Sequence, residues 1–245
     1  MMKKKKVLFI SQEITPYLEE SELSNAGRFL PQGIQEAGKE IRTFMPKFGC
    51  INERRNQLHE VIRLSGMNLI INDTDHPLII KVGSIQPARM QVYFIDSEDF
   101  FNRKGTTHCH ETKKHCHGWM TSLVPLYIKT SYSKDPIFEN SKVVYSIYNN
   151  NFDKTLNQNF ADKAMMDGIS DEHVADYKKT SFVDINKAAM NLSDAVVMGC
   201  EKIHPELEDY FNTIDKPKLN YHDAESFVQA HSEFYDEILE SVLQD

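Results

Sequence analysis

The alternation of apolar and polar positions near the amino terminus predicts a β-α-β unit. Residues 7–10 are consecutively apolar, which is typical of a strand buried on both faces. Apolar residues then recur at helical spacing over residues 23–37, and Gly38 stands where a C-cap glycine belongs. A second apolar run, residues 41–45, stops at Pro46. This order predicts a right-handed parallel crossover, whose first loop lies at the carboxyl edge of the sheet, where open α/β folds bind ligands.

The next apolar runs are too close together to leave room for helices. They cover residues 61–64, 67–71 and 78–82, and turn-forming residues separate the last two. Strands joined this closely pair antiparallel. We therefore expect a β-meander over about residues 58–90, attached to one edge of the main sheet.

The remainder of the chain returns to an α/β pattern. Buried strands are predicted at 91–95, 142–147 and 195–198, helices at 118–132, 181–192, 205–211 and 224–243, and short helices within 156–174. The predicted fold class is α/β: a mostly parallel, doubly wound sheet with an antiparallel β-meander insertion and a C-terminal helix. We expect one domain over residues 1–245, with a helical tail over about residues 201–245.

Composition narrows the classes of partner. The net charge of -8 argues against nucleic acid, because phosphate binding needs a basic face. No apolar run approaches the roughly 20 residues of a membrane span, so no membrane partner is expected. Four cysteines are too few for a dense disulfide framework, which favours a cytoplasmic location. No glycine-rich phosphate fingerprint is present, and no cofactor is expected.

Blocks of residues in one order over roughly residues 5 to 205 carry a family resemblance. They are Lys6-Val-Leu-Phe-Ile-Ser, Glu13-x-x-Pro16-Tyr17, Leu30-Pro31, Met45-Pro46, Val92-Tyr-Phe-Ile-Asp96, Phe101-x-Arg103, His115-Cys-His117-Gly-Trp119 and Ser193-Asp-Ala-Val-Val197. The set resembles the amino-terminal domain of bacterial glycogen synthases and plant starch synthases. The resemblance implies a Rossmann-like fold and a hexosyltransferase reaction, in which glucose passes from a nucleotide-diphosphate glucose to an α-1,4-glucan.

The first loop departs from this family in charge. Where the family reads Lys-Thr-Gly-Gly, with the lysine and glycine amides against the donor's phosphates, this chain reads Glu19-Glu20-Ser21-Glu22. At ~4–6 Å a carboxylate repels a diphosphate that a lysine attracts, a reversal of several kcal/mol in a desolvated cleft. We therefore expect the isolated chain to lack the family's donor chemistry.

Two further departures fall in the other blocks. Gly118 replaces the family's aspartate between His117 and Trp119. Tyr148 replaces a histidine before Asn149. A tyrosine donates a hydrogen bond to a sugar hydroxyl but carries no positive charge near neutral pH.

Two parts of the family's sequence have no counterpart in this chain. After Val197 about 48 residues remain, too few for the second Rossmann domain that holds most of the nucleotide sugar in the family. Eleven residues separate Arg103 from His115, where the family has a helix and a strand that lies beside the first strand. Three explanations stay open: the sheet closes up, another segment fills the gap, or residues are missing from the chain.

No residue stands out as catalytic. The candidates for a substrate cleft are Glu13, Tyr17, Glu19, Ser21, Glu22, His117, Gly118, Trp119, Tyr148 and Asn149. Trp119 has two interpretations, an ordinary packing residue at a helix start or an aromatic wall of a sugar cleft. For the other loop residues the alternative to a sugar contact is a solvated surface position.

Two His-Cys-His triplets form a weak metal candidate. His108, His110, His115 and His117 could supply a tetrahedral zinc site. Their spacing matches no standard zinc finger, which favours adventitious binding over a native metal centre.

Two functional hypotheses follow. The first is a glucosyltransferase whose active site is completed by a partner protein that supplies a second Rossmann domain. The second is a non-catalytic module that binds glucan or regulates polysaccharide metabolism. A glucan or small sugar is a better ligand candidate than a nucleotide sugar under either hypothesis.

Overall fold

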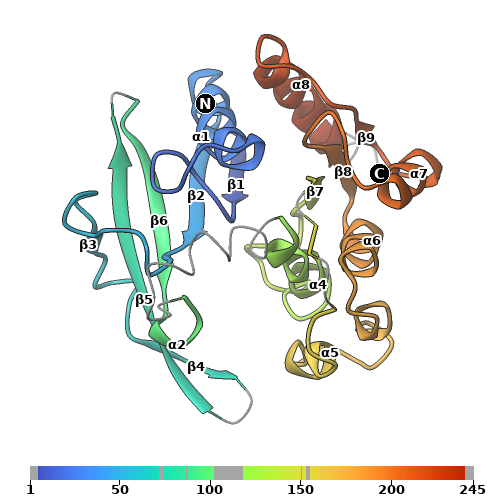
Figure 1. Cartoon of the computed structure of the whole chain (residues 1–245), viewed down its shortest axis with the longest axis horizontal. Coiled ribbons are helices and arrows are strands. Elements are labelled where there is room, and N and C mark those ends of the chain that lie inside the picture. The colour runs from blue at the N-terminus through green and yellow to red at the C-terminus, as the bar shows by residue number, and fades with distance from the viewer. Residues whose placement is uncertain are drawn as a thin grey trace. The chain divides into compact units, whose positions relative to one another are not determined.

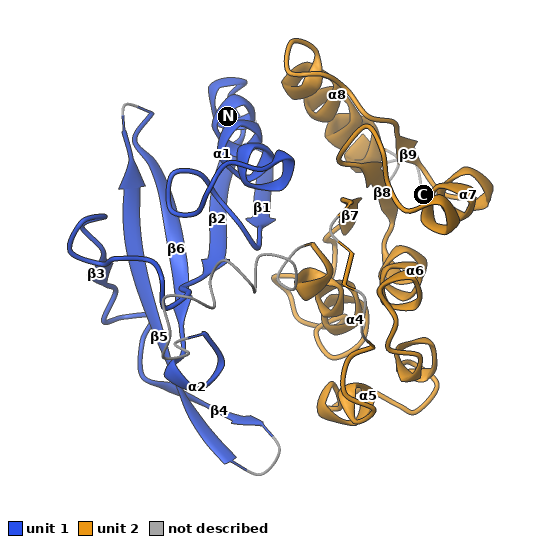
Figure 2. Ribbon diagram, viewed as in Figure 1, with its two compact units in different colours: residues 1–113 blue, residues 114–245 orange. Residues whose placement is uncertain are grey.

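The computed structural model describes residues 5–71, 74–86, 88–101, 118–149, 151–152 and 155–240. The chain divides into two compact units, residues 1–113 and 114–245 (Figure 2). Each unit has its own sheet. The single domain over residues 1–245 therefore stays a prediction. No helix within the described ranges is both long and apolar enough to cross a membrane.

Unit 1 is built on a mixed six-stranded sheet (Figure 1). In spatial order its strands are β1 (Lys6–Ile10), β2 (Glu40–Pro46), β6 (Met90–Asp96), β5 (Thr74–Ile85) and β3 (His59–Glu60), and β4 (Met67–Ile71) also pairs with β5. Strands β1, β2 and β6 are parallel, whereas β5 runs antiparallel to β6 and to both short strands. The predicted crossover and the antiparallel extension at one edge of the sheet are confirmed.

Helix α1 (Glu22–Glu36) connects β1 to β2, and local chemistry fixes both of its ends. At the start, the Ser24 N–H donates to Ser21 Oγ at 3.0 Å and the Ser21 N–H donates to Ser24 Oγ at 2.8 Å, which is a capping box. At the end, Gly38 has a φ of +93°, a left-handed conformation that favours glycine. The predicted C-cap glycine is confirmed.

The prediction that the first strand is buried on both faces is wrong. Along β1 the exposure alternates, and Leu8 and Ile10 are 47% and 37% exposed. Among the described residues β1 lies at one end of the strand order, and its exposed side chains lie on the face opposite to the one that α1 covers. On that covered face Ile41, Thr43 and Met45 of β2 are buried, and α1 contacts β2.

The meander differs from the prediction in its first strand. Residues 61–64 form a turn rather than a strand. The Leu64 N–H donates to Val61 O at 2.9 Å, so these residues bond locally instead of extending a ladder. The Val61 and Gly66 N–H groups on either side of the turn donate to β5, which holds the turn against that strand. A short helix, α2 (Glu98–Phe101), was not predicted.

Unit 2 has a three-stranded parallel sheet in the order β7 (Val144–Ile147), β8 (Ala195–Met198) and β9 (Lys218–Leu219). Its helices are α4 (Leu123–Lys129), α5 (Phe160–Lys163), α6 (Phe182–Leu192), α7 (Pro205–Thr213) and α8 (Phe227–Glu240), with 3₁₀ turns η1 (Trp119–Thr121) and η2 (Ala175–Lys178). The helix predicted over residues 118–132 is divided into η1 and α4. Strand β9 was missed, because two residues carry no periodicity.

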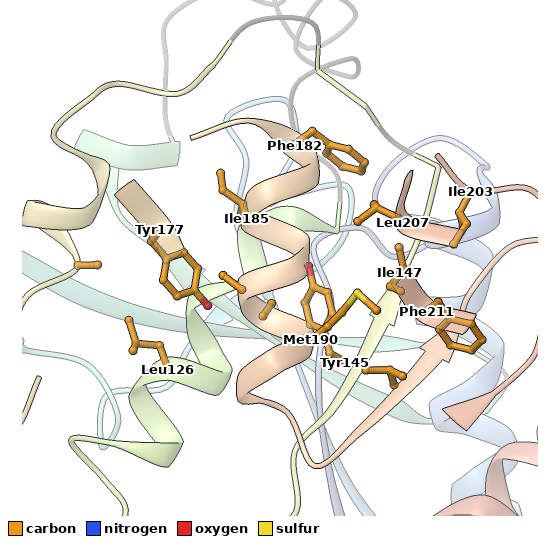
Figure 3. Close-up of a cluster of buried hydrophobic side chains, with 14 of the residues drawn as sticks. Leu126, Tyr145, Ile147, Tyr177, Phe182, Ile185, Met190, Ile203, Leu207 and Phe211 are labelled. Carbon is orange, nitrogen blue, oxygen red and sulfur yellow. The ribbon is translucent and has the colours of Figure 1, made fainter. Parts of the chain in front are cut away.

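Both faces of this second sheet are covered. One face packs against the cluster in Figure 3, in which Tyr145 and Ile147 of β7 meet Ile185 and Met190 of α6. The buried Tyr145 hydroxyl donates to Asn186 Oδ1 at 2.8 Å. On the other face, residues of α8 pack against Ala195 and Val197 of β8. The doubly wound α/β class is confirmed.

Candidate functional site

In unit 1 the loop after β1 is pressed against α1. Ser11 Oγ donates to Glu13 O at 2.7 Å, which shapes the loop. A Cβ on Gly27 of α1 would lie 2.4 Å from Glu13 O and 2.7 Å from Ser11 Oγ. Only glycine therefore allows the helix to approach this closely, and the approach fixes Glu13 at the carboxyl edge of β1.

The Glu13 carboxylate lies beside the amino terminus of α1. Ser21, the N-cap residue, donates its hydroxyl to Glu13 Oε2 at 3.1 Å, and Glu13 is 5% exposed. A helix amino terminus carries a partial positive charge and attracts anions. Here a buried carboxylate of the chain itself stands where an external anion would approach.

Three more carboxylates surround this junction. Glu19, Glu20 and Glu22 are exposed and flank Ser21 in sequence. Ser24 Oγ donates to Glu19 O at 2.8 Å, which ties the loop backbone to the first turn of α1. The structure thus brings Glu13 and Ser21 together, and Glu19 and Glu22 lie on either side of Ser21 along the chain.

Tyr17 is placed in the core of unit 1. It is 9% exposed, and its ring meets Phe94 edge-on with 4.8 Å between centroids. Burial raises the pKa of its hydroxyl to about 12. A Cβ on Gly83 of β5 would lie 2.8 Å from that hydroxyl, so the glycine makes room for it. A role for Tyr17 in a sugar cleft stays a prediction.

Gln12 is a polar residue that sequence reasoning missed. It lies two residues after the end of β1, is 1% exposed, and neither side-chain amide atom has a hydrogen-bond partner among the described residues. An unsatisfied buried amide costs stability, so such a group requires an explanation. Position at the carboxyl end of a strand was the one signal that could have singled it out.

In unit 2, Gly118 and Trp119 begin the turn η1. Gly118 has a φ of +42° and caps η1, a backbone geometry that favours glycine over the family's aspartate. Thr121 Oγ1 donates to Gly118 O at 2.8 Å. The Trp119 ring lies 5.1 Å from that of Phe152, and the tryptophan packs against the buried cluster. The packing interpretation of Trp119 gains support, and the aromatic-wall interpretation stays a prediction.

Tyr148 and Asn149 follow β7 and lie against the turn after β8. A Cβ on Gly199 would lie 2.4 Å from the Tyr148 ring, so this ring covers the glycine. The Asn149 N–H donates to Cys200 Sγ at 3.1 Å. Cys200 is fully buried. Trp119 and Tyr148 both pack on the same cluster of unit 2.

The histidine candidates cannot be placed in this way. His108, His110, His115 and His117 lie outside the described residues. Among the residues that are described, no group of three or more histidine, cysteine, aspartate or glutamate side chains could hold a metal ion. The metal site therefore stays a weak prediction.

Parallel strands with polar loops at their carboxyl ends define a Rossmann-like α/β protein. Comparison with protein families is specific: the family model described as the starch synthase catalytic domain matches residues 6–114 and 112–213. The chain belongs to this family.

Comparison with individual proteins agrees with this family assignment. The chain is 32% identical over 174 residues to a glycogen synthase of Chlorobium phaeobacteroides, covering 59% of this chain and 36% of that protein. It is 30% identical over 201 residues to a glycogen synthase of Chlorobaculum parvum, covering 68% and 41%. The chain thus spans well under half the length of these relatives.

A solved structure shows the same fold. The catalytic domain of starch synthase IV from Arabidopsis thaliana, bound to ADP and acarbose, aligns with a TM-score of 0.61 and 15% sequence identity. The alignment covers 96% of this chain and 50% of that one.

The alignments also indicate an internal gap. The 174 aligned positions contain 59% of a 245-residue chain, about 145 residues, so about 30 positions of the Chlorobium relative have no counterpart here. The two segments that match the family model meet at residues 112–114.

Proposed function

We propose that this chain is a glucosyltransferase domain of the glycogen and starch synthase type that does not bind a nucleotide-diphosphate glucose donor by itself. Family membership and fold support the first part of the proposal. The reaction of the family, transfer of glucose to an α-1,4-glucan, would then require a partner chain that supplies a second Rossmann domain.

The acidic start of α1 is the observation that carries the second part. Glu13 is held 3.1 Å from the N-cap hydroxyl of Ser21, and exposed carboxylates flank that residue. Two unit charges about 5 Å apart interact by about 3 kcal/mol at an effective dielectric constant of about 20. A diphosphate at this helix terminus would therefore meet a repulsion that the family's lysine and glycines replace with attraction.

Titration calorimetry tests the proposal directly. The lone chain is titrated with ADP-glucose and, separately, with maltooligosaccharides. We expect no heat of donor binding at millimolar concentrations. Submillimolar binding of ADP-glucose by the unmodified chain contradicts the proposal, whereas binding of maltooligosaccharide alone favours the non-catalytic glucan-binding candidate.

A charge-matched pair of variants isolates the cause. Glu19→Gln combined with Glu22→Gln removes two charges beside the helix amino terminus, and we expect tighter binding of inorganic pyrophosphate by about tenfold or more. Glu36→Gln combined with Glu40→Gln removes the same net charge at the far end of α1 and at the start of β2. Equal gains in both pairs would show a net-charge effect and defeat the local explanation.

A further inference from the structure

Charged side chains of unit 1 form a ring at the carboxyl end of β6. Glu53, in the turn between β2 and β3, lies 2.8 Å from Lys47 Nζ through Oε1 and 2.8 Å from Lys81 Nζ through Oε2. Lys81 Nζ also lies 2.7 Å from Asp96 Oδ2. The remaining side of the ring is the 4.0 Å gap between Lys47 Nζ and Asp96 Oδ1, which we call the open side.

The sheet fixes the two groups of the open side. Lys47 directly follows β2 and Asp96 ends β6, and these strands are parallel neighbours. The Lys47 N–H donates to Ile95 O at 2.9 Å, which holds the lysine backbone against the end of β6. Both side chains are 7% exposed. The open side therefore lies at the carboxyl ends of parallel strands, where open α/β folds bind ligands.

Both groups of the open side have hydrogen-bonding capacity left. Asp96 Oδ1 is buried and has no hydrogen-bond partner among the described residues. Of the contacts between Lys47 Nζ and these residues, only the one to Glu53 has hydrogen-bond length, although an ammonium carries three N–H donors. A buried carboxylate oxygen without a partner costs stability and requires an explanation. The open side thus offers one donor and one acceptor to a further group.

The charges of the ring define the chemistry of that group. The bonds from Lys47 and Lys81 lower the pKa of Glu53. Burial lowers the pKa of Lys81, and the bonds to Asp96 and Glu53 raise it above its ordinary value. Two ammoniums and two carboxylates give no net charge. A phosphate would meet the carboxylates and a metal ion would meet the ammoniums, so the ring favours a neutral group over either ion.

A hydroxyl group matches the open side in geometry as well as in charge. An oxygen about 2.8 Å from each of two atoms spans a gap of 4.0 Å between them. A hydroxyl accepts a hydrogen bond from an ammonium and donates its own proton to a carboxylate. Glu53 is 40% exposed, so the ring reaches the surface through this residue.

We propose that Lys47 and Asp96 bind one hydroxyl group of a neutral sugar. Lys47 Nζ donates to the sugar oxygen, and the sugar hydroxyl donates to Asp96 Oδ1. Glu53 and Lys81 hold the two groups in place. The need for a neutral hydroxyl follows from the ring, whereas the choice of a glucose unit as the sugar rests on the proposed function.

A nuclear magnetic resonance titration of the full chain with glucose tests this proposal. A set of monodeoxy glucoses, each lacking a different hydroxyl, is titrated in parallel. We expect glucose to shift the backbone amide signals of Lys47 and Asp96. One analogue should bind about tenfold more weakly or worse, because a buried polar pair rejects the ligand that leaves it unpaired. Unaltered signals throughout the glucose titration, or equal binding of glucose and all the analogues, overturn the proposal.

A charge-conserving variant separates binding from folding. Lys47→Arg keeps the positive charge, and its longer guanidinium reaches across the open side to Asp96. The midpoint of urea unfolding should stay or rise, while glucose binds about tenfold more weakly and loses its advantage over the rejected analogue. Lys6→Arg is the matched control and should bind normally. Lys6 Nζ also lies 4.0 Å from a carboxylate oxygen, that of Glu40, but its side chain is 69% exposed.

Two results with these variants also decide against the proposal. If Lys47→Arg folds stably and binds glucose and every analogue as the unmodified chain does, the open side holds only water. If Lys6→Arg weakens binding as much as Lys47→Arg, the sugar binds through general surface contacts. Failure of the proposed function is a separate result, because it is measured by calorimetry of the unmodified chain with ADP-glucose.

Discussion

The burial of His231 makes unit 2 sensitive to acid in a defined pH range. This residue lies on α8, is 3% exposed, and its Nδ1–H donates to Phe227 O at 2.8 Å. Its ring packs against those of Phe227 and Tyr235, at 4.5 and 6.0 Å between centroids. Burial lowers the pKa of His231 from 6.5 to about 4, the bond to Phe227 O raises it slightly, and neighbouring His222 lowers it further.

The sign and size of the effect follow from proton linkage. Above pH 6.5 neither the folded nor the unfolded chain protonates this imidazole, and its pKa shift costs no stability. Between pH 6.5 and 4 the unfolded chain takes up the proton and the folded chain does not, so stability falls as the pH falls. Below pH 4 the loss is complete, at about 3 kcal/mol, and about 2 kcal/mol of it is present at pH 5.

Urea unfolding at pH 7.5 and pH 5 measures this loss. The chain has a single tryptophan, Trp119, which lies in unit 2, so its fluorescence reports the unfolding of that unit. His231→Gln removes the titrating group and should lose about 2 kcal/mol less than the unmodified chain between the two pH values. His222→Gln is the control and should keep most of the original dependence. An unaltered pH dependence in His231→Gln would refute the reasoning.

Three other substitutions test contacts elsewhere. Lys81→Met should lower the free energy of unfolding in urea by about 3 kcal/mol, because Lys81 Nζ lies 2.7 Å from Asp96 Oδ2 and this carboxylate, 5% exposed, would lose that charge partner. Adding Asp96→Leu should recover most of the loss, and a double variant without recovery would contradict the pairing argument. Gly27→Ala should lower the free energy of unfolding by about 2 kcal/mol, since the added Cβ would lie 2.4 Å from Glu13 O. An unchanged melting temperature in calorimetry would show instead that the loop moves away without cost. Gly199→Ala should displace the Tyr148 ring that covers it, so that unit 2 unfolds at a lower urea concentration when followed by Trp119 fluorescence. An unchanged midpoint of urea unfolding would count against the tight contact.

Elements whose signal is local could be predicted from sequence. The stripe of α1 and Gly38 determine that helix and its end, and residues 195–198 coincide with β8. The exposure of Leu8 and Ile10 in β1 could not be predicted in this way, because it depends on which elements pack on the faces of the sheet. Residues 61–64 are as apolar as a strand, yet they bond locally as a turn.

The candidate site was predictable in composition but not in geometry. The sequence shows the acidic loop, but the hydrogen bond from Ser21 to Glu13 joins residues eight positions apart and depends on the path of the loop. Tyr17 matches a family block, and its burial against Phe94 follows from tertiary packing. On α8 the spacing of His231 places it on the same buried side as Phe234 and Ile238, but a polar residue carries no signal in the apolar pattern.

The reciprocal bonds between Ser21 and Ser24 have a consequence for any attempt to rebuild a phosphate loop in this protein. With these bonds the first turn of α1 is complete without a ligand. A glycine at position 21 would free the approach for an anion and, in the same step, leave that turn frayed. Order in the loop and binding of the anion at the helix terminus would then become a single equilibrium, and nucleotide affinity in such a redesigned chain would be recorded as a gain in melting temperature.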